Sequence, residues 1–223
     1  MTGSSRVLAV CVVHALLSDP ESAVGVTSID KRPVAGPVLV TELGVTGDSQ
    51  SDTANHGGAD QAVYAYAEAD AAWWAGELAR PVPPGLFGEN LRTEGIDVTG
   101  AEIGERWRIG AEVVVEVTGP RIPCATFQRR MGESHWVRRF TERGAPGAML
   151  RVHAVGEIEV GDPVEVVHRP GHGVTVGAAF LRPAPADMRL LLDAEKAGQI
   201  VLGESMRKRA RKAVRRFGFP GRT

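Results

Sequence analysis

Between residues 7 and 167 the chain alternates short runs of β-branched residues with turns rich in Gly, Pro and Asp. This pattern is typical of a closed or strongly curved sheet and not of a wound α/β fold. A first strand is expected over residues 7–17, and the clearest later strands are expected over residues 34–41, 106–109, 113–118, 149–154 and 164–168.

One helix is expected to interrupt these strands. Residues 62–78 are rich in Ala and Glu, and Trp73, Trp74 and Leu78 are spaced to share an apolar stripe. The first part of this segment, residues 62–66, fits a strand equally well.

The pattern changes after His168. Residues 170–173 are typical of a linker, and helices are expected over residues 185–194 and 205–217. The second helix is amphipathic, with an apolar side of Met206, Ala210, Val214 and Phe217 opposite a basic side of Arg207, Lys208, Arg211, Lys212 and Arg215. We therefore expect a mainly β domain over residues 1–168 and a small helical extension over residues 169–223.

Overall charge adds little to this picture. The chain of 223 residues has 26 basic and 27 acidic side chains, so its net charge of -1 indicates neither nucleic acid nor an anionic membrane as partner. The basic side of the last helix is accordingly expected to be a solvated surface, with a nucleic-acid contact as the alternative.

The apolar run at residues 7–17 is expected to be a strand and not a signal peptide. His14 interrupts it, and Ser18-Asp19-Pro20 replaces the small residues of a cleavage site. Cys11 and Cys124 form no metal-binding spacing, and a reducing cytoplasm is the simplest compartment for them.

Residues 120–124, Pro-Arg-Ile-Pro-Cys, hold a cysteine on a stiff turn directly after an expected strand. The two prolines fix φ and restrict the residues before them. Arg121 favours a thiolate, the form of cysteine that binds soft metals or attacks electrophiles. Cys124 is therefore the first candidate for chemistry, the alternative being a small buried apolar residue.

Two further segments could approach a ligand. His56-Gly57-Gly58 is polar, and its glycines let backbone amides come close to a bound group, although turn chemistry explains the segment as well. Lys31 and Arg32 supply two cations on a restricted loop that could hold a phosphate, the alternative being surface solubility.

Residues 86–91, Leu-Phe-Gly-Glu-Asn-Leu, place Glu89 and Asn90 between apolar anchors. An Asn amide can donate and accept hydrogen bonds, as recognition of a heterocycle requires; the alternative is that both residues cap a turn. The sequence has no Gly-rich nucleotide loop, no His-Glu-x-x-His and no Gly-x-Ser-x-Gly, so neither a kinase nor a hydrolase is indicated.

Five motifs follow one another along the chain: Lys31-Arg32-Pro33, His56-Gly57-Gly58, Phe87-Gly88-Glu89-Asn90-Leu91, Pro120-Arg121-Ile122-Pro123-Cys124 and Gly161-Asp162. In this order they resemble the MOSC domain, and more narrowly the YiiM-type MOSC proteins, known as 6-N-hydroxylaminopurine resistance proteins. The resemblance runs from about residue 28 to residue 167, and residues 169–223 resemble the three-helix extension of that branch.

The resemblance implies a β-barrel domain that binds a molybdenum cofactor, with Cys124 as the protein ligand to the metal; a soft thiolate suits molybdenum. The implied activity is the reduction of N-hydroxylated compounds, such as hydroxylaminopurines and amidoximes, to amines. Electrons are expected from NADPH or NADH through a separate flavoprotein or iron-sulfur reductase, because the chain has no dinucleotide fingerprint of its own.

The resemblance also implies roles for single residues. Lys31 and Arg32 are expected to hold the cofactor phosphate, and Asn90 with the backbone near Gly88 to contact the pterin. Cys124 and His56 are the expected catalytic residues, with His56 binding cofactor or relaying a proton. The expected cofactor-binding set is Lys31, Arg32, His56, Gly57, Gly58, Gly88, Glu89, Asn90, Arg121 and Cys124.

One position departs from the pattern. Gln61 stands where related chains commonly have Lys, which is expected to weaken binding of an anionic cofactor unless Arg121 compensates.

Two other functions stay open at this point. MOSC domains also end the molybdenum cofactor sulfurases, so Cys124 could carry a persulfide, although the chain shows no pyridoxal-phosphate domain as a sulfur source. A cofactor carrier without reductase activity would use the same binding residues. A homodimer is also open, and purified protein could be empty of cofactor.

Overall fold

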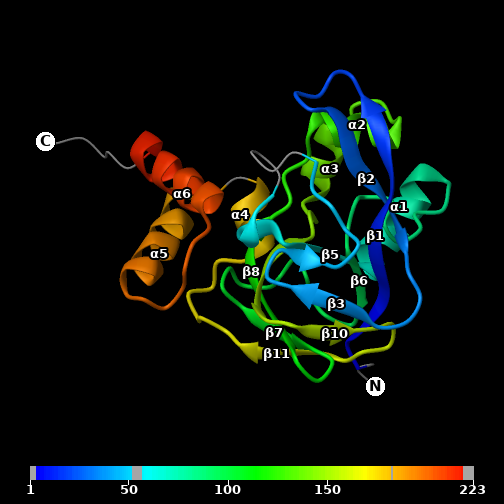
Figure 1. The fold of residues 1–223 in the computed structure, drawn as a ribbon. Helices are drawn as coiled ribbons and strands as arrows, with labels where there is room; N and C mark the ends of the chain where they lie inside the picture. Colours follow the sequence, from blue (N-terminus) through cyan, green and yellow to red (C-terminus); the bar gives the residue numbers. More distant parts are fainter. Residues whose placement is uncertain (1–3, 52–56, 182, 218–223) are drawn as a thin grey trace, which may run out of the picture.

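The structure is a computed structural model that describes residues 4–51, 57–181 and 183–217. Its main sheet has eight strands in the order β11-β7-β8-β9-β5-β6-β1-β2 (Figure 1). Their bounds are β1 (Arg6–Asp19), β2 (Gly25–Pro33), β5 (Val63–Ala67), β6 (Leu91–Glu94), β7 (Arg106–Ile109), β8 (Val113–Pro120), β9 (Ala148–Ala154) and β11 (Val164–His168). A second sheet has the order β10-β3-β4, with β10 (Gly156–Ile158), β3 (Val38–Thr41) and β4 (Gly44–Val45).

The main sheet is strongly curved. The start of β1 reaches the segment ahead of β11, where the Val7 amide donates to the Asp162 carbonyl (2.9 Å) and the Gly161 amide donates to the Val7 carbonyl (2.9 Å). Arg6 and Pro163 form an isolated antiparallel bridge at the same place. The sheet therefore curves so far that β1 contacts the segment ahead of β11, although β1 and β11 lie far apart in the sheet order. This confirms the curved, mainly β fold expected from the sequence.

Side-chain alternation decides which face of β8 forms the core. Val113, Val115 and Val117 are at most 1% exposed, because every second residue of a strand faces the same side. Trp107 of β7 and Leu150 of β9 belong to the same hydrophobic cluster. Full burial of one such side chain contributes about 1.5–3 kcal/mol to the free energy of unfolding. The buried residues of β8 therefore fix the position of the turn that follows it.

Residues 62–78 divide into β5 and the helix α1 (Glu68–Leu78). All five residues of β5 are buried, so the strand alternative for the first part of this segment is confirmed. Trp73 and Trp74 do not share a stripe, since Trp74 is 1% and Trp73 42% exposed; adjacent helical residues point about 100° apart. The strand expected from residue 34 begins only at Val38, because Gly36 takes a positive φ of 76°.

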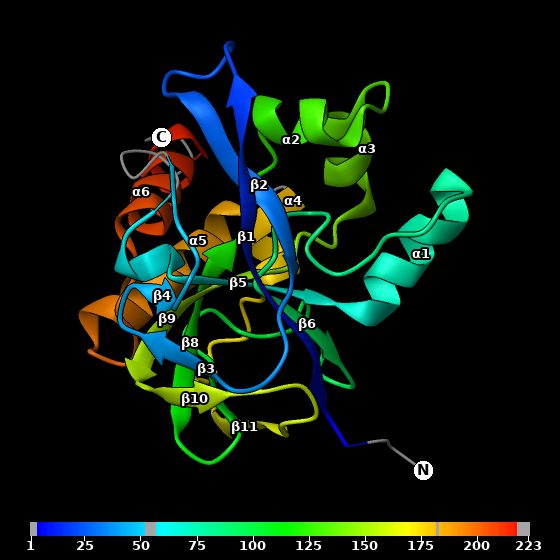
Figure 2. The same cartoon turned by 45° about the vertical axis from the view of Figure 1, so that its right-hand side comes forward.

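Two helices were not predicted, namely α2 (Ala125–Met131) and α3 (Trp136–Arg143). Both are short, and each ends at a glycine with positive φ, Gly132 (66°) and Gly144 (75°), a common helix stop. Their buried residues are Phe127, Met131, Trp136 and Phe140. Figure 2 shows both helices near the tip of the β1–β2 hairpin.

Phe87 is the centre of the aromatic cluster that holds these helices. Its ring centroid lies 5.4 Å from that of Phe127, 5.6 Å from that of Trp136 and 6.0 Å from that of Phe140. Such pairs add about 0.5–1.5 kcal/mol each beyond the area they bury. The segment around Phe87 and the turn between β8 and α2 are thereby fixed to each other.

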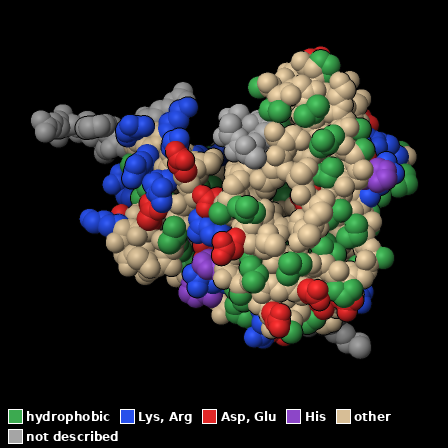
Figure 3. Space-filling view, viewed as in Figure 1, with side chains coloured by type: hydrophobic (Ala, Val, Ile, Leu, Met, Phe, Trp, Pro, Cys, Tyr) green, Lys and Arg blue, Asp and Glu red, His purple; other side chains and the backbone are tan. Residues whose placement is uncertain are grey.

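Three helices follow the sheet, as expected: α4 (Val176–Leu181), α5 (Pro185–Lys196) and α6 (Glu204–Phe217). Met188 and Leu191 of α5 and Met206 and Ala210 of α6 are buried in the same cluster as the strands. The extension therefore packs directly on the sheet, and the expected boundary after residue 168 stays a prediction. Figure 3 shows Lys and Arg side chains gathered over α5 and α6.

None of the helices in the described part of the chain combines the length and the apolar character that a membrane crossing requires.

Candidate functional site

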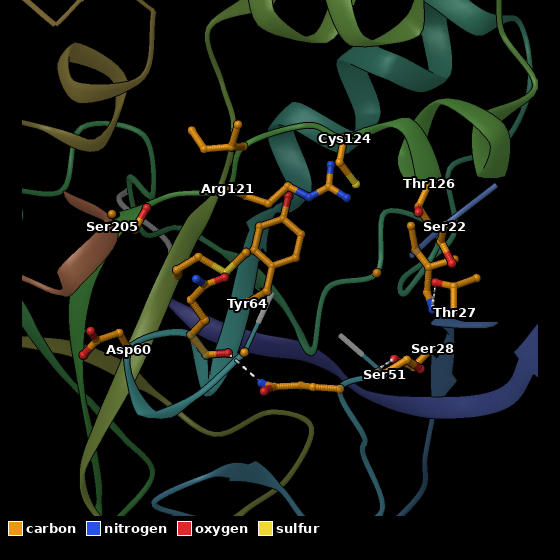
Figure 4. A pocket seen from close by; sticks show the side chains of 18 of the residues that line it. Ser22, Thr27, Ser28, Ser51, Asp60, Tyr64, Arg121, Cys124, Thr126 and Ser205 are labelled. Atoms are coloured by element: carbon orange, nitrogen blue, oxygen red, sulfur yellow. Dashed lines mark hydrogen bonds between the residues drawn. The ribbon is translucent and has the colours of Figure 1, made fainter. Parts of the chain in front are cut away.

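A cavity of about 820 Å³ lies between the β1–β2 hairpin, the turn after β8 and the start of α6 (Figure 4). Typical ligand sites have about 300–1,000 Å³. Its wall includes Ser22, Thr27 and Ser28 of the hairpin, Tyr64 of β5, Thr118 of β8, and Ser205 of α6. These elements lie far apart in the sequence, and the curvature of the sheet together with the docking of α6 brings them to one space.

Cys124 lies on this wall at the residue before α2. Its backbone is extended (φ −127°, ψ 175°), and its carbonyl accepts a hydrogen bond from the Gln128 amide (3.0 Å). The thiol is unpaired, half-buried and caps no backbone group. In Figure 4 its sulfur points into the space beside the Arg121 side chain. Cys124 is therefore available to a ligand in the cavity and is not sealed in packed hydrocarbon.

Arg121 lines the same cavity and is 7% exposed. Its guanidinium carbon lies 3.6 Å from the centroid of the Phe127 ring and 5.7 Å from that of Tyr64, contacts worth about 0.5–2 kcal/mol each. Within the described residues, Nη1 has no hydrogen-bond partner. A buried cation held by ring faces and lacking a counter-charge can take an anion.

Lys31 and Asn90 also line the cavity, and both are bonded to Asp48. The Lys31 Nζ lies 2.6 Å from Asp48 Oδ2, and Asn90 Nδ2 donates to the same oxygen (2.8 Å). Asn90 further accepts from the Tyr64 amide (3.1 Å) and donates to the Cys11 carbonyl (3.2 Å). This end of the cavity satisfies its own polar groups.

Arg32 and Glu89 were expected in the site, and the structure does not bring them to the cavity wall. The Arg32 side chain is 59% exposed and pairs with Asp30 (3.3 Å). Glu89 is fully buried, where it accepts from the Phe87 amide (3.0 Å) and pairs with Arg92. Lys31 and Arg32 lie in β2 and not on the loop expected for them, and neighbouring side chains of a strand face opposite sides, so Arg32 faces away from the cavity. Glu89 is instead drawn inward by its ion pair with the buried Arg92.

Of the expected glycines, Gly57 and Gly88 lie on the wall. Gly58 is exposed beside it, and its amide donates to Gln50 Oε1 (3.1 Å). Gly88 has φ 79°, and a Cβ there would come within 3.1 Å of Ile29 Cγ1. Both features favour glycine, which leaves the backbone accessible at this point of the wall. His56 lies outside the described residues.

Gln61, the position that departs from the motif pattern, lines the cavity. Six residues at or just before the start of α6 also line it, and the sequence did not place them in the site, namely Gly203, Glu204, Ser205, Met206, Lys208 and Arg209. The amphipathic pattern of α6 predicts which side faces the core, but only the docking of the helix determines that its first two turns face the cavity.

A family model described as the MOSC domain matches residues 52–165. YflK of Bacillus subtilis is 34% identical over 67% of this chain and 67% of its own length, and YiiM of Escherichia coli is 33% identical over 64% and 65%. A protein of Gibberella moniliformis named a reductase is 32% identical over 65% of this chain and 26% of its own length. The chain thus spans less than two thirds of YiiM and about a quarter of the reductase.

The crystal structure of YiiM from Geobacillus stearothermophilus has a similar fold, with a TM-score of 0.74 and 25% identity over 94% of this chain and 99% of that chain. The chain belongs to the MOSC domain family and, within it, to the YiiM type.

Proposed function

We propose that this protein binds a molybdenum cofactor through Cys124 and reduces N-hydroxylated compounds to amines. The observation that carries the proposal is an unpaired thiol that faces a cavity of about 820 Å³ from the residue before α2. Membership of the MOSC family supports it, because MOSC domains are associated with molybdenum cofactor binding in general. The name of the Gibberella relative supports a reductive direction.

The residues present fit an anionic metal cofactor. Cys124 is the one thiol on the described cavity wall, and a single soft thiolate suits a metal that brings its other ligands with it. Arg121 offers a buried guanidinium nitrogen that lacks a partner among the described residues, and an anionic group would satisfy it. Lys31 keeps donor capacity beyond its bond to Asp48, because an ammonium has three N–H groups.

When bound, such a cofactor would supply two-electron redox chemistry. In the overall reaction the N–O bond of the substrate breaks, two electrons and two protons are taken up, and the oxygen leaves as water. The chain would hold the metal at Cys124, hold anionic groups at Arg121 and Lys31, and exclude bulk water with the hairpin and α6. His56 remains the expected proton relay.

The electrons are proposed to come from a separate NAD(P)H-dependent flavoprotein or iron-sulfur protein, since the sequence lacks a dinucleotide fingerprint. The free thiols Cys11 and Cys124 agree with a reducing cytoplasm as the compartment.

The experiment is turnover of an amidoxime by protein made in a host that produces the cofactor, with an artificial low-potential electron donor. Wild type is expected to form the amine. The turnover rate of Cys124→Ser is expected to fall more than about 100-fold. Loss of an outer-shell partner of a metal costs up to about 100-fold in activity, and loss of a direct ligand is expected to cost more. Cys11→Ser is the matched control and is expected to keep its turnover.

Equal turnover by wild type and Cys124→Ser would contradict the proposal. Cofactor bound at Cys124 without turnover would instead favour a cofactor or persulfide carrier, which requires the same open thiol.

A further inference from the structure

The cavity wall carries five basic side chains and three acidic ones, Glu21, Asp60 and Glu204. Its basic side chains are Lys31, Arg121, Arg129, Lys208 and Arg209. Three of them form ion pairs, namely Lys31–Asp48 (2.6 Å), Arg129–Asp19 (2.7 Å) and Lys208–Glu204 (2.6 Å). Within the described residues, Arg121 and Arg209 form no ion pair with a carboxylate.

Arg209 lies on α6 and is half-buried. Its Nη2 donates to the Phe180 carbonyl in the last turn of α4 (2.6 Å), while its buried Nε has no partner among the described residues. Burial lowers the pKa of the Arg209 guanidinium, and no carboxylate offsets that effect. The bond to Phe180 uses Nη2 and the Nε is buried, so Nη1 is the nitrogen left for a ligand.

The two arginines line the same cavity, and each contacts one of two neighbouring phenylalanines. The Arg121 guanidinium carbon lies 5.9 Å from the centroid of Phe140, the Phe140 and Phe180 centroids are 6.4 Å apart, and Arg209 is bonded to the Phe180 backbone. Two like charges that face one cavity repel each other, and an anion between them relieves that repulsion.

We propose that Arg121 and Arg209 form an anion subsite of the cavity and that its ligand carries a phosphate monoester. A phosphate dianion matches two guanidinium charges and can accept from both planar groups, whereas a carboxylate neutralises one. Two sources share this chemistry, the phosphate of the cofactor and the phosphate of a nucleotide substrate. Both assignments rest on the function proposed above, whereas the binding of phosphate itself does not.

The test is calorimetric titration of the purified full chain with inorganic phosphate at low salt. Wild type is expected to bind, and Arg209→Gln to bind about tenfold more weakly or worse, because a bond to a charged group is lost. Lys212→Gln is the matched control, since it removes an exposed cation of the same helix that does not line the cavity, and its affinity is expected to change less than about twofold. Arg209→Lys keeps the charge and is expected to recover part of the binding.

Equal phosphate affinity of wild type and Arg209→Gln overturns the proposal, as does a wild type that does not bind phosphate. Melting curves of all variants identify any that fail to fold, and Arg209→Lys then carries the comparison through its loss of the planar fork.

Two further measurements separate the sources. Loss of pterin from Arg209→Gln purified from a cofactor-producing host assigns the phosphate to the cofactor. A raised KM for an N-hydroxylated nucleotide, with an unchanged KM for the free base, assigns it to the substrate. Phosphate binding by a wild type that takes up no molybdenum in a cofactor-producing host would reject the proposed function and leave the subsite standing.

Discussion

The polar side chains at one end of the cavity are bonded to one another, whereas those at the other end lack partners within the part of the chain that the structure describes. At the β2 end, Lys31, Asp48 and Asn90 satisfy one another through bonds of 2.6 and 2.8 Å. At the end formed by the β8–α2 turn, Cys124 is unpaired and Arg121 has an orphan nitrogen among the described residues. We therefore infer the position of a ligand from polar groups that lack a partner, and not from burial or charge alone.

The two cysteines show the same difference. Cys11 is fully buried in β1, and burial raises the pKa of its thiol to about 12, with the nearby Glu89 carboxylate acting in the same direction. Cys124 is half-buried on the cavity wall. Cys11 thus behaves as a small apolar core residue, the alternative that the sequence left open for Cys124.

The largest expected effect is at the satisfied end. Asp48→Ala leaves Lys31 and the Asn90 amide without their shared acceptor and is expected to lower the free energy of unfolding by about 3 kcal/mol. Urea denaturation monitored by circular dichroism measures it. The double variant Lys31→Met with Asp48→Asn is expected to recover part of the loss, and no recovery would show that the pair is not the cause.

A smaller effect separates the thiols. Cys11→Ser places a hydroxyl in a fully buried site and is expected to cost about 1–3 kcal/mol of unfolding free energy. Cys124→Ser, whose side chain meets the cavity, is expected to stay within about 0.5 kcal/mol of wild type. The same urea titrations compare the two, and equal losses would contradict the difference in their surroundings.

Alkaline pH is expected to act through Cys11. The folded pKa of about 12 exceeds the ordinary value of 9.0, so the folded state keeps a proton that the unfolded state loses. The resulting stability is complete below pH 9 and is lost as pH rises toward 12, by at most about 1.4 kcal/mol per pH unit. Urea midpoints of wild type and Cys11→Ala from pH 7 to 10.5 are expected to converge above pH 9, and parallel curves would exclude the effect.

The smallest expected effect is at the open end. Arg121→Met removes a buried cation that lacks a carboxylate partner, so the ligand-free protein is expected to change by less than about 1 kcal/mol in either direction. Phosphate binding, by contrast, is expected to be lost. A destabilisation as large as that of Asp48→Ala would show that Arg121 serves the fold and not a ligand.

Much of the fold follows from local pattern. The bounds of β7 and β11 agree with the expected residues 106–109 and 164–168, and β8 and β9 overlap the expected strands, because their apolar residues alternate or run continuously. The helices α2 and α3 could not be predicted, since each buries only two residues and depends on the aromatic cluster around Phe87.

The sequence predicted positions on the cavity wall at Cys124 and Gly88, where a motif sets the backbone shape. It did not predict which of two adjacent residues faces the cavity, because that depends on the folded backbone: Lys31 and Asn90 line the wall, whereas Arg32 and Glu89 do not. Arg209 carries no motif at all and reaches the cavity through the docking of α6.

The central claim is that Cys124 holds a molybdenum cofactor, and the most direct measurement is the molybdenum and pterin content of protein purified from a cofactor-producing host. Wild type and Cys11→Ser are expected to contain nearly equimolar metal, and Cys124→Ser to lose most of it while its circular dichroism spectrum stays that of a folded protein. Equal metal content in wild type and Cys124→Ser would contradict the account.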